Sequence, residues 1–220
     1  MNQGIDNQNS QLFFDISSRN IKNVHLYGTF YLDELKIERI GDPENFNFWS
    51  TKVGAKTTNL WVQNLSVNIE YSMSMPINYQ HRVSTLTYES NYYNMGYYLK
   101  DNSQEIYISL GYKPIRGLHL NASYMLAQHG PDYDYTLDGT VTTHTFMEEV
   151  KWQNQTVSFK TSYEFINNAY LFFEYMMMDT QGDIDVYQPG DIVYDYLDIY
   201  TPEFFQGKNN IISAGFNIGF

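Results

Sequence analysis

Large apolar side chains occupy every second position over long stretches of the chain. In residues 65–75, LSVNIEYSMSM, they alternate with Ser, Asn and Glu, and the C-terminal NIISAGFNIGF alternates in the same way. Successive side chains of a β-strand point to opposite faces, so a period of two predicts strands with one apolar and one polar face.

The alternation predicts nine strands. They cover residues 11–20, 23–35, 49–58, 63–75, 104–113, 117–128, 146–166 (either continuous or broken near 153–155), 169–179 and 207–220. The runs are about 9 to 13 residues long, whereas soluble strands typically have about 5 to 6 and a tilted transmembrane strand needs about 9 to 11. We therefore expect an all-β fold, an antiparallel transmembrane β-barrel of the bacterial outer membrane. The alternative is a soluble β-sandwich that buries both apolar faces.

The connections alternate between short and long. Short ones fall at 20–23, 59–63, 113–117 and 166–168, and long ones at 36–48, 76–103, 129–145 and 180–206. Short periplasmic turns and long outer loops are typical of membrane barrels. A tenth strand at 82–90 would put the later turns on the wrong side. We therefore predict one long outer loop at 76–103, folded over or into the barrel mouth, and an acidic outer loop at 180–206.

Nine strands is an odd number, and single-chain bacterial barrels usually have an even one. The first residues, MNQGIDNQNSQ, lack the basic and apolar regions of a signal peptide. We therefore expect residues 1–220 to be the C-terminal portion of one larger barrel domain, with further strands before residue 11.

Charge and composition narrow the function classes. The net charge is −12, which argues against nucleic acid as a partner, and the chain has no Cys for disulfides or thiolate metal sites. The histidines show no metal-binding spacing, and no nucleophile elbow is present. We expect no enzymatic activity, no metal and no cofactor.

The acidic loop carries closely spaced carboxylates without a full calcium-loop pattern, so we expect a solvated loop rather than a calcium site. These residues are Asp179, Asp183, Asp185, Asp191, Asp195, Asp198 and Glu203.

The long loop at 76–103 is rich in tyrosine. Aromatic rings offer flat faces to sugars and their hydroxyls hydrogen-bond the rims, so the loop is a candidate carbohydrate-binding element. The candidate residues are Tyr79, Tyr88, Tyr92, Tyr93, Tyr97, Tyr98 and Asn102. The alternative, that the rings pack the loop on itself, is compatible with this role.

Two motifs resemble known families. The terminal FNIGF resembles the signature by which outer-membrane proteins are delivered to the barrel-assembly machinery, which implies that Phe216, Ile218 and Phe220 form the assembly signal. The segments EYSMSMPINYQH and YNMGYYLKDNSQEIY resemble the Wzi-like capsule-assembly barrels, especially those of the Bacteroidetes. The matching positions are Glu70, Tyr71, Pro76, Tyr79, His81, Gly96, Leu99, Asn102 and Glu105.

The Wzi-like resemblance covers roughly residues 63–128. The pattern departs at Tyr97 and Tyr98, where it has His-Pro, and at Lys100, where it has Gly. The resemblance implies a non-enzymatic barrel of about eighteen strands, in contact with outer-membrane lipid, that binds, attaches or organises surface (capsular) polysaccharide. A porin-like channel is an alternative function. Another is a scaffold that contacts other outer-membrane subunits in a secretion or gliding-motility complex.

Overall fold

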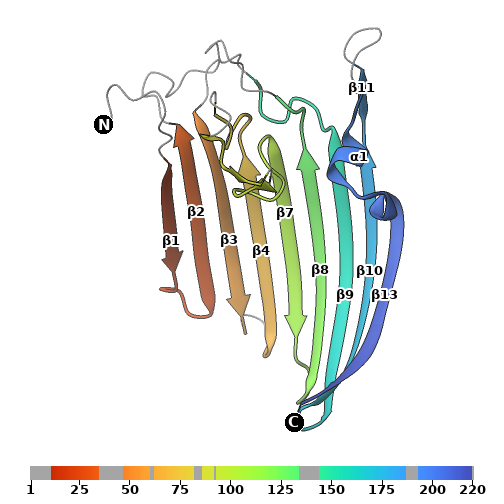
Figure 1. The fold of residues 1–220 in the computed structure, drawn as a ribbon. Coiled ribbons are helices and arrows are strands. Elements are labelled where there is room, and N and C mark those ends of the chain that lie inside the picture. The colour runs from red at the N-terminus through yellow and green to blue at the C-terminus, as the bar shows by residue number, and fades with distance from the viewer. Residues whose placement is uncertain are drawn as a thin grey trace.

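The computed structural model describes residues 11–34, 47–59, 62–81, 86–91, 93–133, 144–186 and 193–219. Nine strands form one antiparallel sheet in which strands that follow one another along the chain lie side by side (Figure 1). They are β1 (Leu12–Ser18), β2 (Val24–Glu34), β3 (Phe48–Thr58), β4 (Leu65–Ser74), β7 (Ser103–Tyr112), β8 (Leu118–His129), β9 (Trp152–Ile166), β10 (Ala169–Gly182) and β13 (Gly207–Ile218). The all-β prediction of nine consecutive antiparallel strands is confirmed.

Two strand boundaries differ from the predictions by more than two residues. β9 begins at Trp152 rather than 146 and is continuous through 153–155, and β10 continues to Gly182 rather than ending at 179. The ladder extends beyond the apolar stretch because Thr180 pairs with Asn154, and their side chains share a buried hydrogen bond of 2.7 Å. Both faces are polar there, so the alternation that predicts strands is lost although the pairing continues.

The four short turns lie at one end of the sheet and the long loops at the other (Figure 1). Each short turn has a residue with positive φ: Asn23 at 64°, Asn64 at 63°, Gly117 at 81° and Asn168 at 62°. Asn and Gly tolerate this left-handed conformation best, so local turn chemistry supports the tight connections.

Two of the long loops are largely described, and we call them the first and the second long loop. The first long loop, residues 75–102, adds no strand to the sheet within its described part. It contains a two-strand ribbon of β5 (Glu89–Ser90) and β6 (Tyr93–Asn94). Of residues 82–90, the alternative tenth strand, the structure describes 86–90, and only Glu89 and Ser90 pair there, within this ribbon.

The second long loop, residues 183–206, contains β11 (Ile184–Val186), β12 (Val193–Asp195), α1 (Tyr196–Tyr200) and a 3-10 helix at Glu203–Phe205. Since β10 extends to Gly182, this loop begins three residues later than predicted. The helices of the described ranges are too short to qualify as membrane-crossing helices.

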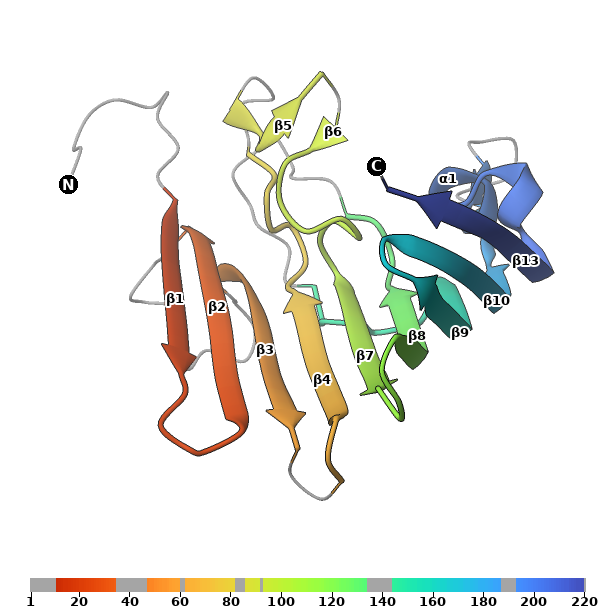
Figure 2. The same ribbon diagram turned by 90° about the horizontal axis from the view of Figure 1, so that it is seen from below.

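The sheet curves, and the first long loop lies on its concave side (Figure 2). Register sorts the side chains cleanly between the two faces. Along one row of the convex face, Ile69 pairs with Ile108, Ile108 with Tyr124, and Tyr124 with Val157. The row behind them on the concave face contains Asn68, Ser109, Ser123 and Ser158. The convex face is therefore apolar and the concave face is mainly polar, although Phe172, Met176 and Ile211 also lie on the concave face of β10 and β13.

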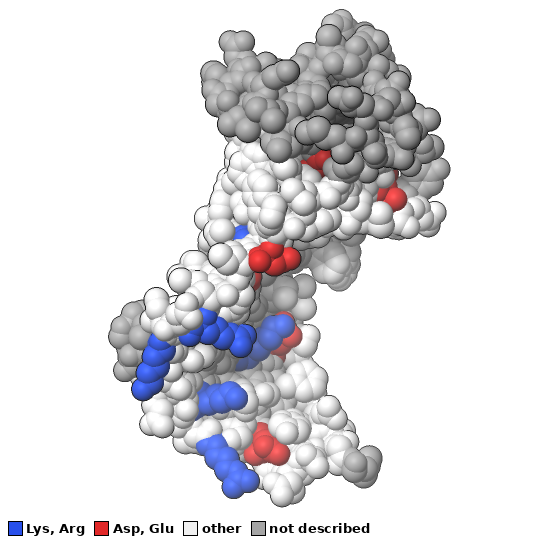
Figure 3. Space-filling view, turned by 90° about the vertical axis from the view of Figure 1, so that its left-hand side faces the viewer, with Lys and Arg blue, Asp and Glu red and all other residues white. Residues whose placement is uncertain are grey.

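The buried apolar core of the described chain lies at the long-loop end. Leu99, Ala127, Trp152 and Tyr196 form one cluster that joins both long loops to β8 and β9. Basic side chains gather instead in the opposite half, toward the short turns, when the sheet is seen from its β1 edge (Figure 3).

Candidate functional site

The first long loop is held against the concave face at two strained residues. Ile77 and Tyr79 have φ values of 64° and 72°, in the left-handed region that non-glycine residues rarely adopt. The Ile77 amide donates to the Asp101 carboxylate at 2.8 Å, and the Tyr79 amide donates to the Asp33 carboxylate at 3.1 Å. Such strain persists only where surrounding contacts hold it, and these two carboxylates supply that restraint.

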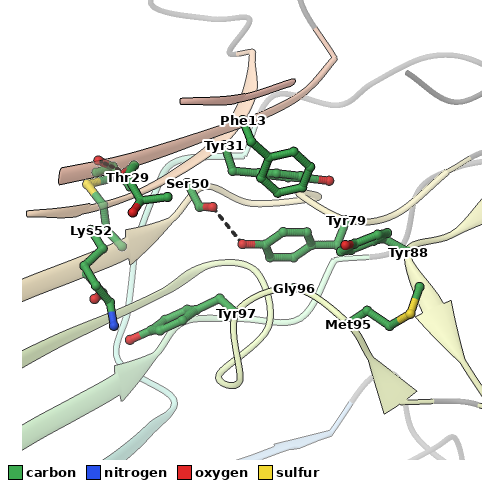
Figure 4. A pocket seen from close by; sticks show the side chains of 13 residues that line it. Phe13, Thr29, Tyr31, Ser50, Lys52, Tyr79, Tyr88, Met95, Gly96 and Tyr97 are labelled. Carbon is green, nitrogen blue, oxygen red and sulfur yellow. Dashed lines mark hydrogen bonds between the residues drawn. The ribbon is translucent and has the colours of Figure 1, made fainter. Parts of the chain in front are cut away.

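Tyr79 then carries the loop onto the sheet through its side chain. Its hydroxyl donates to Ser50 Oγ at 2.7 Å, and its ring centroid lies 5.0 Å from that of Tyr31 and 6.4 Å from that of Tyr88. A Cβ added to Gly96 would come within 2.4 Å of the Tyr79 ring, so only glycine permits this close approach. The result is a layer of stacked aromatic rings between loop and sheet (Figure 4).

A cavity of about 360 Å³ lies beside this layer (Figure 4). Its wall combines strands β1 to β4 with the loop: Phe13, Thr29, Tyr31, Ser50, Thr51, Lys52, Ser72, Met73, Tyr79, Tyr88, Met95, Gly96 and Tyr97. Small-molecule sites typically measure about 300–1,000 Å³ and combine apolar walls with a few polar groups, which matches this cavity.

Two hydroxyls in the cavity wall are buried without a hydrogen bond of standard geometry. They belong to Tyr31 and Tyr97, and the side chains beside them are Asp33 and Ser72, respectively. Burial, followed by the charge of Glu105, raises the pKa of Tyr97, so its hydroxyl remains a proton donor. A buried unsatisfied hydroxyl costs about 1–3 kcal/mol, so both groups would gain from a polar ligand.

Lys52 is the cationic group of the wall, and its side chain makes no ion pair or hydrogen bond within the described part of the chain. The described lining has no carboxylate or imidazole, so the cavity offers aromatic faces, hydroxyls and one ammonium rather than an acid–base pair. No group of three or more potential metal ligands occurs among the described residues.

The predicted carbohydrate-binding tyrosines divide into two sets. Tyr79, Tyr88 and Tyr97 line the cavity. Tyr93 and Tyr98 are 77% and 62% exposed and lie outside its lining. Tyr92 falls outside the described residues.

Asn102 has a different position from the tyrosines. It is 1% exposed, its amide donates to the Pro131 carbonyl at 2.8 Å, and its carbonyl accepts from the Met147 amide at 2.9 Å. With both ends of its amide bonded to backbone, Asn102 ties the first long loop to the β8–β9 connection and leaves little surface for a ligand.

The sequence alone did not predict that residues of the sheet would line a cavity together with the loop. Phe13, Tyr31 and Lys52 precede the loop by 23 residues or more, and only the strand register brings them beneath it. The available signal was the large ring of Phe13 on the same face of its strand as Asp15 and Ser17.

The acidic loop uses several of its carboxylates locally. Asp185 pairs with Lys151 at 2.9 Å, and Asp195 caps α1 by accepting from the amides of Leu197 and Asp198. Lys151 also pairs with Glu149 at 2.6 Å, and these partners raise its pKa. Asp191 lies outside the described residues.

The residues of the predicted assembly signal lie on the last strand of the sheet. Phe216 and Ile218 lie on the convex face of β13 and are 71% and 52% exposed. Phe220 falls outside the described residues.

Comparison with known proteins gives no identification. No protein-family model matches the chain, and no curated protein and no solved structure matches it significantly.

Proposed function

We propose that the chain is part of an outer-membrane β-barrel whose long loops bind surface polysaccharide. The observation that carries this proposal is the distribution of side chains over the curved sheet. A water-soluble barrel or sandwich buries apolar side chains on its inner face. Here the concave face is mainly polar and the convex face is apolar, as in a barrel with lipid outside and water within.

The apolar band reaches every strand of the sheet. Large side chains of the convex face that are more than a third exposed are Leu12, Phe14, Ile16, Leu26, Val53, Ile69, Ile106, Ile108, Leu110, Tyr112, Tyr124, Val157, Phe159, Tyr163, Phe165, Leu171, Phe173, Met177, Ile212, Phe216 and Ile218. At about 1 kcal/mol for each half-exposed side chain, transfer to hydrocarbon would contribute more than about 10 kcal/mol.

A polar rim bounds the band at the long-loop end. Tyr71 donates to Gln104, Gln104 to Gln128, and Gln128 to Gln153, each at 3.0 Å, across four neighbouring strands. The charged pair of this face, Asp179 with Lys208 at 3.9 Å, lies at the same end. Polar and aromatic residues at the edge of an apolar band are typical of the lipid–water interface.

The two edge strands of the sheet determine whether nine strands can close a barrel. β1 pairs only with β2, and β13 only with β10, within the described residues. Unpaired backbone groups are costly in a bilayer, so we propose that further strands pair with both edges to close a barrel larger than nine strands. This arrangement agrees with the Wzi-like resemblance, which also has a Gly where Lys100 here adopts a φ of 63°.

The side chains of the cavity wall indicate which class of ligand it would bind. Aromatic rings from sheet and loop offer stacking faces to sugar C–H groups, and the Tyr31 and Tyr97 hydroxyls can bond to sugar hydroxyls. The long loops of membrane barrels face the cell exterior, where surface polysaccharide is found. We therefore propose a non-enzymatic role in binding or organising that polysaccharide.

A paired set of variants tests the sugar-binding role. Replacing Tyr88 and Tyr97 with Ala removes two cavity rings and should weaken retention of the strain's surface polysaccharide by at least about tenfold, as loss of stacking and hydrogen bonding implies. Replacing the exposed Tyr93 and Tyr98 with Ala is the matched control. Equal retention by both double variants would refute the cavity as the binding site.

A porin-like channel is the second candidate, because the concave face is polar and carries ions of both signs, such as Lys160 and Glu174, paired at 2.8 Å. Conductance across planar bilayers separates the two functions. A steady open pore favours the channel, whereas a closed barrel that retains polysaccharide favours the binding protein.

A further inference from the structure

A second hollow, of about 490 Å³, lies on the concave face near the short turns. Its centre is one cross-strand row in which Thr58 pairs with Ser66, Ser66 with Gly111, and Gly111 with Asn121. The row joins β3, β4, β7 and β8, so it lies on the continuous part of the sheet rather than on a loop.

Cationic side chains flank this row on both sides. Lys56 lies two residues from Thr58 toward the long loops, and Lys113 and His119 lie two residues beyond the row toward the short turns. A step of two residues along a strand is about 7 Å, so the lysine side chains are long enough to converge over the row. The hollow belongs to the half of the molecule in which basic side chains gather (Figure 3).

These cations have no acidic partner within the described ranges. No ion pair or hydrogen bond involves the side chain of Lys56, Lys113 or His119, and no carboxylate belongs to the described lining of the hollow. Lys160 on the same face behaves differently, because its ammonium pairs with Glu174 at 2.8 Å. In a chain of net charge −12, a basic hollow without carboxylates is unusual.

Gly111 keeps the floor of the hollow open. A Cβ at this position would lie 2.7 Å from Ser66 Oγ and 3.8 Å from the Asn121 amide. Ser66 Oγ instead donates to the Gly111 carbonyl at 3.2 Å, and Asn121 stands at the side of the gap. Asn59 and Asn64 from the neighbouring turn add further amide groups to the wall.

We propose that this hollow binds an oxyanion, a phosphate or carboxylate group, between Lys56 and Lys113. Ammonium groups form strong charge-assisted hydrogen bonds to such groups, and the asparagine amides suit the hydroxyls of a molecule that carries the anion. The site lies apart from the aromatic cavity and shares none of its residues, so it does not depend on the sugar-binding proposal.

Calorimetric titration of the full chain, folded in detergent, tests the site with three probes: inorganic phosphate, glucuronate and glucose. We expect phosphate, glucuronate or both to bind and to weaken as salt increases, and glucose to bind far more weakly. Phosphate alone identifies a phosphate group as the ligand, and glucuronate alone identifies a sugar carboxylate. The site does not exist if neither anion binds or if glucose binds as tightly as glucuronate.

Matched variants locate the binding. Lys56→Gln with Lys113→Gln should lower affinity for the bound anion by about tenfold or more, because two charge-assisted bonds are lost. Lys208→Gln, at an exposed position on the convex face at the long-loop end, should leave affinity unchanged, and Lys56→Arg should retain most of it. Unchanged affinity in the double variant, with folding verified by circular dichroism, overturns the proposal.

A substitution without charge change gives a second check. Gly111→Ala narrows the floor and should weaken anion binding, whereas Gly28→Ala, whose added carbon would meet no atom closer than 3.5 Å, should not. Equal binding by the two alanine variants would also contradict the site.

Discussion

Tyr79 links the first long loop to the sheet through one hydroxyl. Tyr79→Phe removes the 2.7 Å bond to Ser50 and keeps the ring between Tyr31 and Tyr88. We expect the loop to lose about 1 kcal/mol of local stability, the usual net contribution of such a bond. Hydrogen exchange of the loop amides measures the loss, with Tyr93→Phe, at a 77% exposed position, as the control. Unaltered exchange in Tyr79→Phe would show that the bond does not restrain the loop.

Asp101 makes the same loop sensitive to pH. Burial, followed by the charge of Asp132, raises the pKa of Asp101 from 3.8 to about 7. Between about pH 4 and 7 the folded loop therefore binds a proton that the unfolded chain does not, so its stability falls as pH rises through this window. The protection factor of the Ile77 amide, which donates to Asp101, should be higher at pH 5 than at pH 8.

Asp101→Asn is the direct test of this pH dependence. Asparagine can still accept from Ile77 but does not titrate, so the variant should show little change in protection between pH 5 and pH 8. Glu89→Gln, on exposed β5 of the same loop, should keep the wild-type profile. A pH profile that is the same for Asp101→Asn and wild type would exclude Asp101 as the cause.

Tyr200 is one of two tyrosines that attach the helix α1 to the end of β8; the other is the fully buried Tyr196. Tyr200 donates to Asp132 at 2.6 Å, and its ring lies 4.4 Å from that of His129, which is fully buried. Tyr200→Phe should destabilise residues 196–201 locally by about 1.5–3 kcal/mol, the range for a bond to a charged group, while the buried Tyr196 keeps the helix on the sheet. Hydrogen exchange should increase there and stay constant in the strands. Phe204→Leu, at a 79% exposed position, is the control. Increased exchange throughout the sheet would mean that Tyr200 supports more than the helix.

Two adjacent residues of strand β7 test which face of the sheet contacts lipid. Ile108 lies on the convex face and Ser109 on the concave face. Arginine at position 108 should destabilise the protein in lipid by about 2–4 kcal/mol, the cost of a cation at the centre of a bilayer, whereas arginine at 109 faces the polar side. Unfolding from lipid vesicles by denaturant measures both variants. Equal losses at the two positions would contradict the lipid-facing assignment.

The strands were predictable because alternation is a local property. It located β4, β7 and β8 to within about two residues, and turn residues such as Asn64 and Gly117 supported the connections. It failed at the start of β9 and the end of β10, where both faces are polar and only pairing maintains the ladder.

The candidate site was only partly predictable, for a related reason. Loop composition indicated Tyr79, Tyr88 and Tyr97, but the contributions of Phe13 and Tyr31 depend on the register of strands distant in sequence. The burial of Asn102 likewise depends on the backbone of another loop, which no local pattern reveals.

At the scale of the whole molecule, the sheet is a single surface with two different faces. Its convex face is apolar across all nine strands, its concave face is mainly polar, and its buried apolar cluster lies at the long-loop end. Lipid on the convex side and water on the concave side account for all three observations together. A second protein layer on the convex face is the competing arrangement, and it makes a different prediction in a lipid bilayer.

Single cysteines test this claim most directly, because the chain has none of its own. The pairs Ile69→Cys with Asn68→Cys, and Ile212→Cys with Ser213→Cys, place a thiol on each face of β4 and β13. In proteoliposomes, labelling by a water-soluble maleimide should be fast at 68 and 213 and slow at 69 and 212, and a fluorophore attached at 69 or 212 should be quenched by nitroxide lipids. Equally fast labelling at all four positions, without lipid quenching at 69 and 212, would contradict insertion of the convex face into the membrane.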